Sequence, residues 1–180
     1  SEKDVPVISL SNAKGAKESW SKPTVVILLW IIAEWIFITN SLQLSSRIRK
    51  SVLQLFGAKI GKRVILRPRL RVKYPWNLEI GDDCWIGEGV WIHNQDKVKI
   101  ENDVCLSQES FITTGSHSFR TDMSLVTKPV FIEAGVWVCS RSIVTMGSHL
   151  GRSCLIPAGS VVSGYVEPGV VFGRIGRDRF

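Results

Sequence analysis

Aliphatic residues recur at every sixth position over much of the chain between residues 60 and 162. Neither an α-helix nor an isolated β-strand has this period, because their side chains repeat every 3.6 and every two residues. A six-residue period is typical of a parallel β-solenoid, in which three short strands make one triangular coil and aliphatic side chains stack along its axis. The repeat comprises Ile60, Leu66, Val72, Ile80, Ile86, Ile92, Val98, Ile100, Leu106, Ile112, Ile132, Val138, Val144, Leu150, Ile156 and Val162.

Small or modest side chains follow many of these positions four residues later, where a solenoid turns a corner. They include Cys84, Ser110, Ser142, Ser148, Cys154 and Ser160. The repeat slips by two residues at YPWNLEI (74–80) and again at KVKI (97–100), which makes the first coils about 20 residues long. The pattern therefore predicts a mainly β fold with about five coils.

The strongest interruption of the repeat is the stretch of nineteen residues between Ile112 and Ile132, which contains TTGSHSF (113–119). A wall of stacked coils has no cleft of its own, so a pocket is expected where a loop projects from it toward a neighbouring chain. We predict that residues 113–131 form this projecting loop and carry the functional chemistry.

Two helices are predicted before the repeat. The apolar run from Val25 to Ile38 contains one acid, Glu34, and it is shorter than the roughly 20 residues that a membrane-spanning helix needs. In the next segment apolar residues recur at helical spacing while basic residues occupy the other faces, which predicts an amphipathic helix. Its apolar positions are Leu44, Ile48, Val52 and Leu55, and its basic positions are Arg47, Arg49 and Lys50. We divide the chain into a helical segment (1–56), a β-helix (57–166) and a tail (167–180).

The charge of the chain is strongly positive, with a formal net charge of +7 and a pI of about 9.5. Residues 41–78 contain ten Lys or Arg residues and no Asp or Glu. Such a block beside an apolar helix favours contact with anionic lipid headgroups, which makes residues 24–56 a candidate for peripheral membrane contact. The alternative is that these helices pack on their own domain or on another subunit. No nucleic-acid partner is expected, because basic motifs interleaved with aromatic residues are absent.

The four cysteines predict neither a zinc site nor a disulfide framework. Cys84, Cys105, Cys139 and Cys154 form no CxxC pair and no tight cluster with histidine. Reduced thiols in a cytoplasm are the simplest interpretation.

Five motifs identify a family. They are LFGAKIGKRVILRP (55–68), YPWNLEIGDDCWIG (74–87), TGSHSF (114–119), GVWVCSRSIVTMG (135–147) and LIPAGSVVSG (155–164). With them the chain resembles the hexapeptide-repeat acyltransferases, and within these the exopolysaccharide O-acetyltransferases of the colanic-acid type. The resemblance implies a left-handed parallel β-helix and a homotrimer with active sites between subunits. It also implies acetyl-CoA as the acyl donor and no metal.

The resemblance assigns the catalytic role to His117. Acetyl transfer to a hydroxyl needs a base, and an imidazole suits this work near neutral pH because its unperturbed pKa is near 6.5. Related sequences often have Asp directly after the histidine, whereas this chain has Ser118. Asp122, Asp96 and Glu109 are candidates to orient the ring, and a backbone carbonyl would serve equally well.

Polar residues near the register slip are candidates for binding the acceptor. In related sugar acetyltransferases polar residues at this level contact the acceptor, which points to Asn94 and Asp96. The alternative is that both cap corners of the coil as Asx turns. Asp122 in the projecting loop is a further candidate for substrate binding.

The resemblance also places the acyl donor along a groove between coils. It puts Trp137 against the pantetheine arm and Ser140 in hydrogen-bonding contact, while Ala158 allows close approach to the backbone. Simple hydrophobic packing is the alternative for Trp137. Arg177 takes roughly the position of a basic residue that contacts the nucleotide, but the sequence FGRIGRDRF (172–180) lacks the Asn-Pro of relatives and a solvated tail is the alternative.

The predicted function is acetyl-CoA-dependent O-acetylation of a sugar hydroxyl in an envelope or exopolysaccharide glycan. The basic N-terminal segment suggests a lipid-linked acceptor at the cytoplasmic face of the membrane. The alternatives are a non-catalytic trimeric scaffold and a metalloenzyme similar to γ-type carbonic anhydrases. Zinc in that family needs three histidines, two of them close in sequence, whereas the three in this chain are 24 and 32 residues apart.

Overall fold

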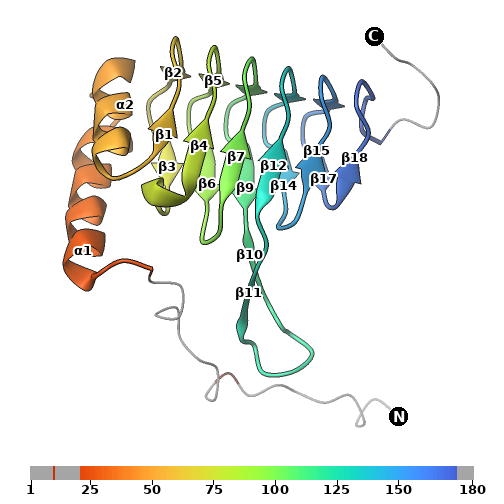
Figure 1. The fold of residues 1–180 in the computed structure, drawn as a ribbon, viewed down its shortest axis with the longest axis horizontal. Coiled ribbons are helices and arrows are strands. Elements are labelled where there is room, and N and C mark those ends of the chain that lie inside the picture. Colours follow the sequence, from red (N-terminus) through yellow and green to blue (C-terminus); the bar gives the residue numbers. More distant parts are fainter. Residues whose placement is uncertain (1–9, 11–20, 174–180) are drawn as a thin grey trace.

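The structure, a computed structural model, describes residue 10 and residues 21–173, which form a parallel β-helix with helices at one end (Figure 1). Three parallel sheets make its sides. Sheet A contains β1 (Lys59–Ile60), β4 (Leu78–Ile80), β7 (Val98–Ile100), β12 (Val130–Ile132), β15 (His149–Leu150) and β18 (Tyr165–Val166). Sheet B contains β2 (Ile65–Leu66), β5 (Trp85–Ile86), β8 (Cys105–Leu106), β13 (Trp137–Val138) and β16 (Leu155–Ile156). Sheet C contains β3 (Arg71–Val72), β6 (Trp91–His93), β9 (Phe111–Thr113), β14 (Ile143–Val144) and β17 (Val161–Val162).

The register of sheet A gives the length of each coil. Ile60 pairs with Ile80 and Ile80 with Ile100, so the first two coils are twenty residues long. Ile100 pairs with Ile132, because an insertion lengthens the third coil, and Ile132 pairs with Leu150 after eighteen residues. A fifth coil follows, and β18 begins another turn. The mainly β fold and the five coils predicted from the repeat are confirmed.

The core is the axis of the solenoid. Every aliphatic residue of the repeat is buried, and the small residues Cys84, Ser110, Ser142 and Ser148 fill the corners at 0% exposure. Close packing of this kind leaves no internal cleft, so binding sites must lie on the outer faces and corners.

The predicted projecting loop is a β-hairpin. Strands β10 (Gly115–His117) and β11 (Leu125–Thr127) pair antiparallel and extend away from the coils (Figure 1). The hairpin leaves β9 in sheet C and returns to β12 in sheet A, so it projects from the corner between these two sheets.

The helices that precede the repeat lie across the first coil (Figure 1). The apolar run forms α1 (Thr24–Ala33) and continues as a π-helix, η4 (Glu34–Ile38). The second helix, α2 (Ser46–Leu55), begins where the Ser45 hydroxyl accepts the Ile48 N–H at 3.4 Å, and a 3₁₀ turn, η5 (Pro75–Asn77), precedes β4. None of the helices in the described part of the chain is long and apolar enough to cross a bilayer.

These helices close the open edge of the β-helix. The first coil has no preceding coil to pair with its backbone, and an unpaired edge is unfavourable. In sheet C the Val72 N–H donates to the Glu34 carboxylate at 2.8 Å, and the Val72 carbonyl accepts from the Trp30 indole N–H at 3.1 Å. This hydrogen bond explains why an acidic residue occurs in an apolar helix: the Glu34 carboxylate serves as the hydrogen-bond acceptor for the open edge of sheet C.

The other two sheets are closed in the same way. In sheet B the Leu66 N–H donates to the Ser46 hydroxyl at 2.9 Å, and the Leu66 carbonyl accepts from the Arg49 guanidinium at 3.4 Å. In sheet A the Ile60 carbonyl accepts from the Gln54 amide at 3.1 Å. The N-terminal helices thus supply hydrogen-bond partners to one edge residue of every sheet.

The prediction for Arg49 was wrong. The helical spacing placed it on a polar face, but its side chain is fully buried between α2 and the first coil. It donates to the carbonyls of Ile38, Gln43 and Leu66, and no ion pair in the described residues includes it. Burial lowers its pKa. Periodicity could not reveal this role, because the partners lie on the loop before α2, the end of η4 and β2.

Candidate active site

His117 lies at the end of β10, on the hairpin, where it pairs with Leu125 of β11. Its side chain is exposed. The turn between the two strands, residues 118–124, is internally bonded, since the Ser118 N–H donates to the Ser124 carbonyl at 3.0 Å. The hairpin therefore carries the imidazole outward from the coils.

A backbone carbonyl orients the ring. Nδ1 of His117 lies 2.9 Å from the carbonyl oxygen of Met123. A carbonyl can only accept, so the hydrogen bond requires the proton on Nδ1, and Nε2 of the neutral ring then carries a lone pair. Met123 has a φ of 56°, a left-handed conformation that is uncommon for a residue with a side chain. Of the four orienting groups considered, the structure shows the backbone carbonyl.

Asp122 shapes the turn that holds this carbonyl. Its carboxylate accepts the Ser124 N–H at 3.0 Å and the Thr121 hydroxyl at 3.2 Å. The bond from Ser124 is the main cause of the lowered pKa of Asp122. These contacts occupy the carboxylate oxygen Oδ1, so Asp122 acts on the loop and does not contact the His117 ring.

Asn94 is a structural residue, which corrects its assignment to the acceptor. Its side chain has 0% exposure. The amide oxygen accepts the Tyr74 N–H at 3.0 Å and the amide nitrogen donates to the Tyr74 carbonyl at 2.6 Å. Both polar ends of the Asn94 amide are therefore occupied inside the protein, where they bond to the Tyr74 backbone at the register slip. The capping alternative describes this residue.

Asp96 lies at the base of the hairpin and is partly exposed. Its N–H donates to the Thr114 hydroxyl at 2.9 Å, and its Oδ1 accepts the Lys97 N–H at 2.7 Å. The residue therefore supports the chain just before β10, where the hairpin begins.

A groove of about 580 Å³ lies at the corner between sheets B and C. It is lined by Gln108, Glu109, Ser140, Arg141, Ala158 and Gly159. The Ser140 hydroxyl donates to the Gln108 side chain at 3.0 Å, and Arg141 pairs with Glu109 at 2.7 Å. Two of the residues predicted to contact the donor, Ser140 and Ala158, are thus brought together in one groove. Glu109 belongs to this groove and not to the hairpin.

Trp137 lies next to the groove, on the outer face of sheet B. The residue is 49% exposed, and its indole N–H donates to the Ser107 hydroxyl at 2.9 Å. An indole fixed in this way presents a flat apolar surface to solvent, which a buried packing residue would not do. Arg177, the fourth residue predicted to contact the donor, lies outside the described residues.

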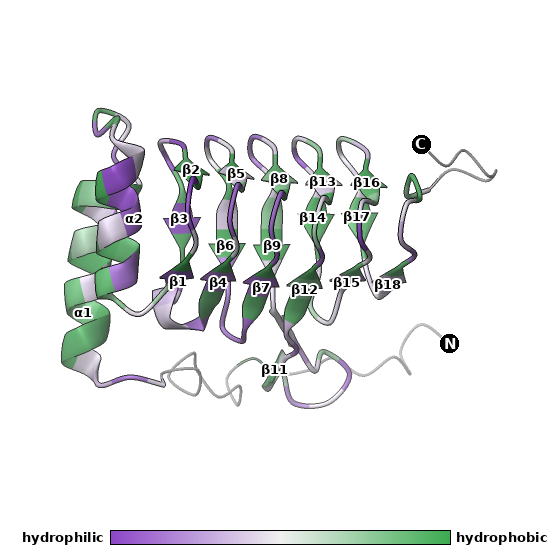
Figure 2. Ribbon diagram, turned by 45° about the horizontal axis from the view of Figure 1, so that its top comes forward, coloured by the Kyte–Doolittle hydropathy of each residue, from purple (hydrophilic) through white to green (hydrophobic). Residues whose placement is uncertain are grey.

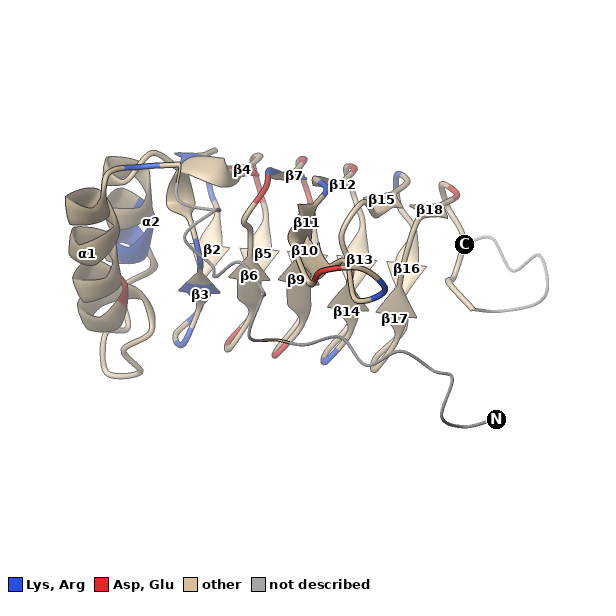
Figure 3. Cartoon of the chain, turned by 90° about the horizontal axis from the view of Figure 1, so that it is seen from below, with Lys and Arg blue, Asp and Glu red and all other residues tan. Residues whose placement is uncertain are grey.

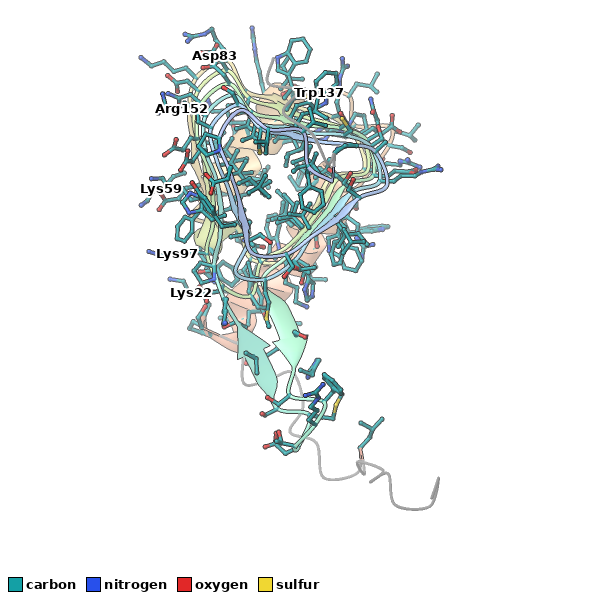
Figure 4. The ribbon with its side chains drawn as sticks, turned by 90° about the vertical axis from the view of Figure 1, so that its right-hand side faces the viewer. Lys22, Lys59, Asp83, Lys97, Trp137 and Arg152 are labelled. Atoms are coloured by element: carbon teal, nitrogen blue, oxygen red, sulfur yellow. The ribbon has the colours of Figure 1, made fainter. Side chains whose placement is uncertain are left out.

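The histidine and the groove lie at different corners of the same protomer. The hairpin projects from the corner between sheets C and A, whereas Ser140 lies between β13 of sheet B and β14 of sheet C. Figure 4 looks along the coils and shows Trp137 on the side opposite to the hairpin. A single protomer therefore does not bring the imidazole to its own groove.

The other two histidines occupy separate positions. His93 packs against the rings of Trp91 and Phe111, and burial lowers its pKa. His149 in sheet A pairs with Glu133 at 2.7 Å. Within the ranges that the structure describes, no group of three or more His, Cys, Asp or Glu side chains is placed to hold a metal ion.

Sequence comparison decides the family. No family model matches the chain. Over 138 residues it is 33% identical to WcaF of Escherichia coli (strain K12), which is named for acetyl transfer in colanic acid biosynthesis, and the match covers 76% of this chain and 75% of that protein. The chain belongs to the hexapeptide-repeat acetyltransferases. A galactoside O-acetyltransferase of Escherichia coli (strain K12) is 25% identical over 127 residues, which cover 68% of this chain and 63% of that enzyme.

Solved structures share the fold of this acetyltransferase. A hexapeptide-repeat acetyltransferase of Vibrio cholerae, solved with acetyl-CoA, superposes with a TM-score of 0.76 at 21% identity, over 87% of this chain and 85% of that chain. A galactoside acetyltransferase solved with coenzyme A gives a TM-score of 0.72 at 21% identity, over 81% of this chain and 75% of that chain. The acetyltransferase identity and the β-helix predicted from the motifs are confirmed.

Proposed function

We propose that this acetyltransferase transfers the acetyl group of acetyl-CoA to a sugar hydroxyl, with His117 as general base. The observation that carries the proposal is the contact of His117 Nδ1 with the Met123 carbonyl. In the neutral ring this contact puts the proton on Nδ1, so Nε2 carries the lone pair that accepts a proton from an acceptor hydroxyl.

The chemistry balances without a further reactant. Nε2 takes the proton of the sugar hydroxyl while its oxygen attacks the thioester carbonyl carbon. Collapse of the tetrahedral intermediate breaks the carbon–sulfur bond, and the imidazolium returns the proton to the departing thiolate. The products are an O-acetyl sugar and coenzyme A, and the ring is neutral again.

The donor is proposed to lie in the groove at the corner between sheets B and C. Ser140 offers a hydroxyl and Ala158 leaves room for close approach to the backbone, while the exposed Trp137 indole flanks the pantetheine arm. Arg177 is proposed to meet the phosphates of the nucleotide, because a guanidinium forms paired hydrogen bonds with phosphate oxygens. Two structural neighbours hold acetyl-CoA or coenzyme A, which is consistent with this donor.

The working form is proposed to be a homotrimer. Since the hairpin and the groove occupy different corners of one protomer, a neighbour standing beside it is needed to bring His117 to a donor. Three protomers in a ring satisfy this need at every boundary, because each hairpin then meets the groove of the next subunit.

The acceptor is proposed to be a glycan of the cell envelope or of an exopolysaccharide, linked to lipid at the cytoplasmic face of the membrane. The names of the relatives, which include colanic acid biosynthesis and galactoside acetylation, favour a sugar. Asp96 is proposed to contact it, and its position at the base of the hairpin supports this proposal. Asp122 is proposed to act on the acceptor only through the turn.

Replacement of the histidine tests the proposal. His117→Gln is expected to lower the rate of acetyl transfer by about 10²–10⁴-fold, because the general base is lost. The KM for acetyl-CoA is expected to stay unchanged, since the donor groove is intact. The assay follows thiol release from acetyl-CoA with a panel of free and lipid-linked glycans, with products identified by mass.

The matched control is His149→Gln, which removes an imidazole from sheet A and should transfer acetyl groups at the wild-type rate. Equal rates in His117→Gln and the wild type would refute the general base. A wild-type protein that acetylates none of the glycans would refute the proposed class of acceptor.

A further inference from the structure

The outer side of α1 and η4 is apolar and uncovered. Eight residues there are between 38% and 74% exposed, namely Val25, Leu28, Leu29, Ile31, Ile32, Trp35, Ile36 and Phe37. We call them the apolar end face. Figure 2 shows α1 as a largely hydrophobic helix at the end of the coils. Contiguous apolar surfaces of this kind mark interaction sites on soluble proteins.

This face contains no charge. Glu34 is the one charged residue between residues 24 and 46, and its carboxylate turns inward to the Val72 N–H. A helix that is apolar on all sides is normally buried. Here one side of α1 packs on the first coil through Ile27 and Trp30, and the other side has no cover in the protomer.

A basic collar surrounds the first coil directly behind the apolar end face. Its residues are Lys59, Lys62, Arg63, Arg67, Arg69, Arg71 and Lys73, and all of them are exposed. Lys62, Arg67 and Lys73 each follow a different strand of this coil, so the charge extends around all three corners. Figure 3 shows basic residues on α2 and the first coil, whereas acidic residues other than Glu34 begin at the second coil.

Part of the basic collar has no acidic partner. Lys59, Arg63 and Arg69 pair with carboxylates of the second coil. Among the described residues, no ion pair includes Lys62, Arg67 or Lys73. The collar therefore retains positive charge at every corner of the coil that is nearest to the apolar end face.

We propose that the apolar end face lies on an anionic bilayer surface, with α1 in the plane of the interface. Interfacial helices bury their apolar side about 5–10 Å into the headgroup boundary. A helix is about 10 Å across, so the basic collar behind α1 then lies at the level of the lipid phosphates. Each basic residue near such a surface strengthens binding about fivefold.

The charge favours a lipid surface over a second copy of the chain. Two copies that met through their apolar end faces would bring two basic collars toward each other. Residues 41–78 contain no Asp or Glu to offset this repulsion. A bilayer with anionic headgroups supplies the opposite charge that the collar lacks.

The docking also agrees with the proposed trimer, and this step rests on the proposed function. In a trimer with parallel coil axes, all three apolar end faces point the same way and contact one flat surface. The hairpin with His117 leaves the third coil, two coil spacings from the collar, which is roughly 10 Å. Acetyl transfer would then occur close to the headgroups, within reach of a lipid-linked glycan.

Vesicle flotation of the full chain tests the docking. The probes are vesicles of phosphatidylcholine alone and of phosphatidylcholine mixed with phosphatidylglycerol. The wild type is expected to float with the mixed vesicles and to be released by salt. The double variant Leu28→Glu with Ile32→Glu should bind about 10²-fold more weakly, because two exposed apolar contacts are replaced by charges.

A matched control replaces two equally exposed residues at the far end of the coils, Val161→Glu with Tyr165→Glu, and should float like the wild type. A collar variant, Lys62→Ala with Arg67→Ala and Lys73→Ala, should bind about 10²-fold more weakly and lose the preference for anionic vesicles.

Three measurements accompany flotation. Circular dichroism checks the fold of each variant, and light scattering gives its mass. Acetyl transfer to a free glycan should persist in Leu28→Glu with Ile32→Glu, which separates failed docking from failed chemistry. The proposal would be overturned if the wild type floated with neither kind of vesicle. It would also be overturned if light scattering showed that the assembly doubles in mass through contacts that Leu28→Glu with Ile32→Glu abolishes.

Discussion

Arg49 offers a direct test of the cap on the first coil. Its guanidinium is fully buried and donates to three backbone carbonyls, one of which is the sheet B edge residue Leu66. The substitution Arg49→Met keeps much of the aliphatic stem and removes every one of these donors. The carbonyls of Ile38 and Leu66 then lose this partner in a buried position, and the carbonyl of Gln43 loses it in a partly buried one.

The expected loss of stability follows from these bonds. A hydrogen bond to a charged group contributes about 1.5–3 kcal/mol. Two of the three hydrogen bonds are long, at 3.4 Å. We therefore take the lower end of this range for each bond, and the three together contribute about 5 kcal/mol. Removing the guanidinium also removes the cost of its burial, which offsets a few kcal/mol. The free energy of unfolding should therefore fall by about 2–3 kcal/mol.

Urea denaturation at fixed protein concentration measures this loss, and hydrogen exchange locates it. Faster exchange is expected in α2 and the first coil, with the later coils unchanged. Arg47→Met is the matched control, because Arg47 is an exposed arginine of the same helix and its loss should change stability by less than about 0.5 kcal/mol. Equal stability of the two variants would refute the role assigned to Arg49.

Two further predictions concern the donor groove and the charge in α1. Ala158→Leu fills the groove at the corner between sheets B and C, so the KM for acetyl-CoA should rise about tenfold without loss of thermal stability. An unchanged KM in steady-state assays would place the donor elsewhere. Burial raises the pKa of Glu34, against smaller opposing effects of the Val72 N–H, Arg71 and Lys73. The folded protein thus holds this proton more tightly than the unfolded chain, and the stabilising contribution is full at low pH and lost as the pH rises through the raised pKa. Glu34→Gln should accordingly gain stability relative to the wild type as the pH rises toward neutral. Urea titrations at several pH values measure the difference in unfolding free energy between the two proteins. A difference that does not change with pH would contradict the assignment.

The coils could be predicted from sequence because the signal is local and repeated. Each aliphatic position of the repeat indicates a side chain in the core, and sixteen positions follow the same pattern. The length of the insertion between Ile112 and Ile132 likewise indicated a projection, and the motif around His117 predicts the catalytic role that we propose for it. The hairpin pairing and the carbonyl of Met123 were not predictable, because they depend on how the turn closes.

The cap on the first coil was beyond sequence reasoning for a different reason. Trp30, Glu34 and Arg49 each bond to a strand that is 17 to 42 residues away along the chain. Hydrophobic periodicity carries no information about hydrogen bonds between residues so far apart in the sequence. Asn94 illustrates the same lack of a local signal. Sequence reasoning suggested that this polar residue contacts the acceptor, whereas in the structure its side chain bonds to the backbone of Tyr74.

The capping residues also determine what the N-terminal helices present to their surroundings. The polar side chains of α1 and η4 that reach the first coil point inward, because the open edge of the sheets needs hydrogen-bond partners. The positions left outside are apolar, from Val25 to Phe37. This reverses the usual arrangement of a surface helix, in which polar residues face solvent and apolar ones face the core. One requirement of the β-helix, the closure of its first coil, therefore accounts for both the inward-facing carboxyl group of Glu34 and the uncharged face that we propose meets the bilayer.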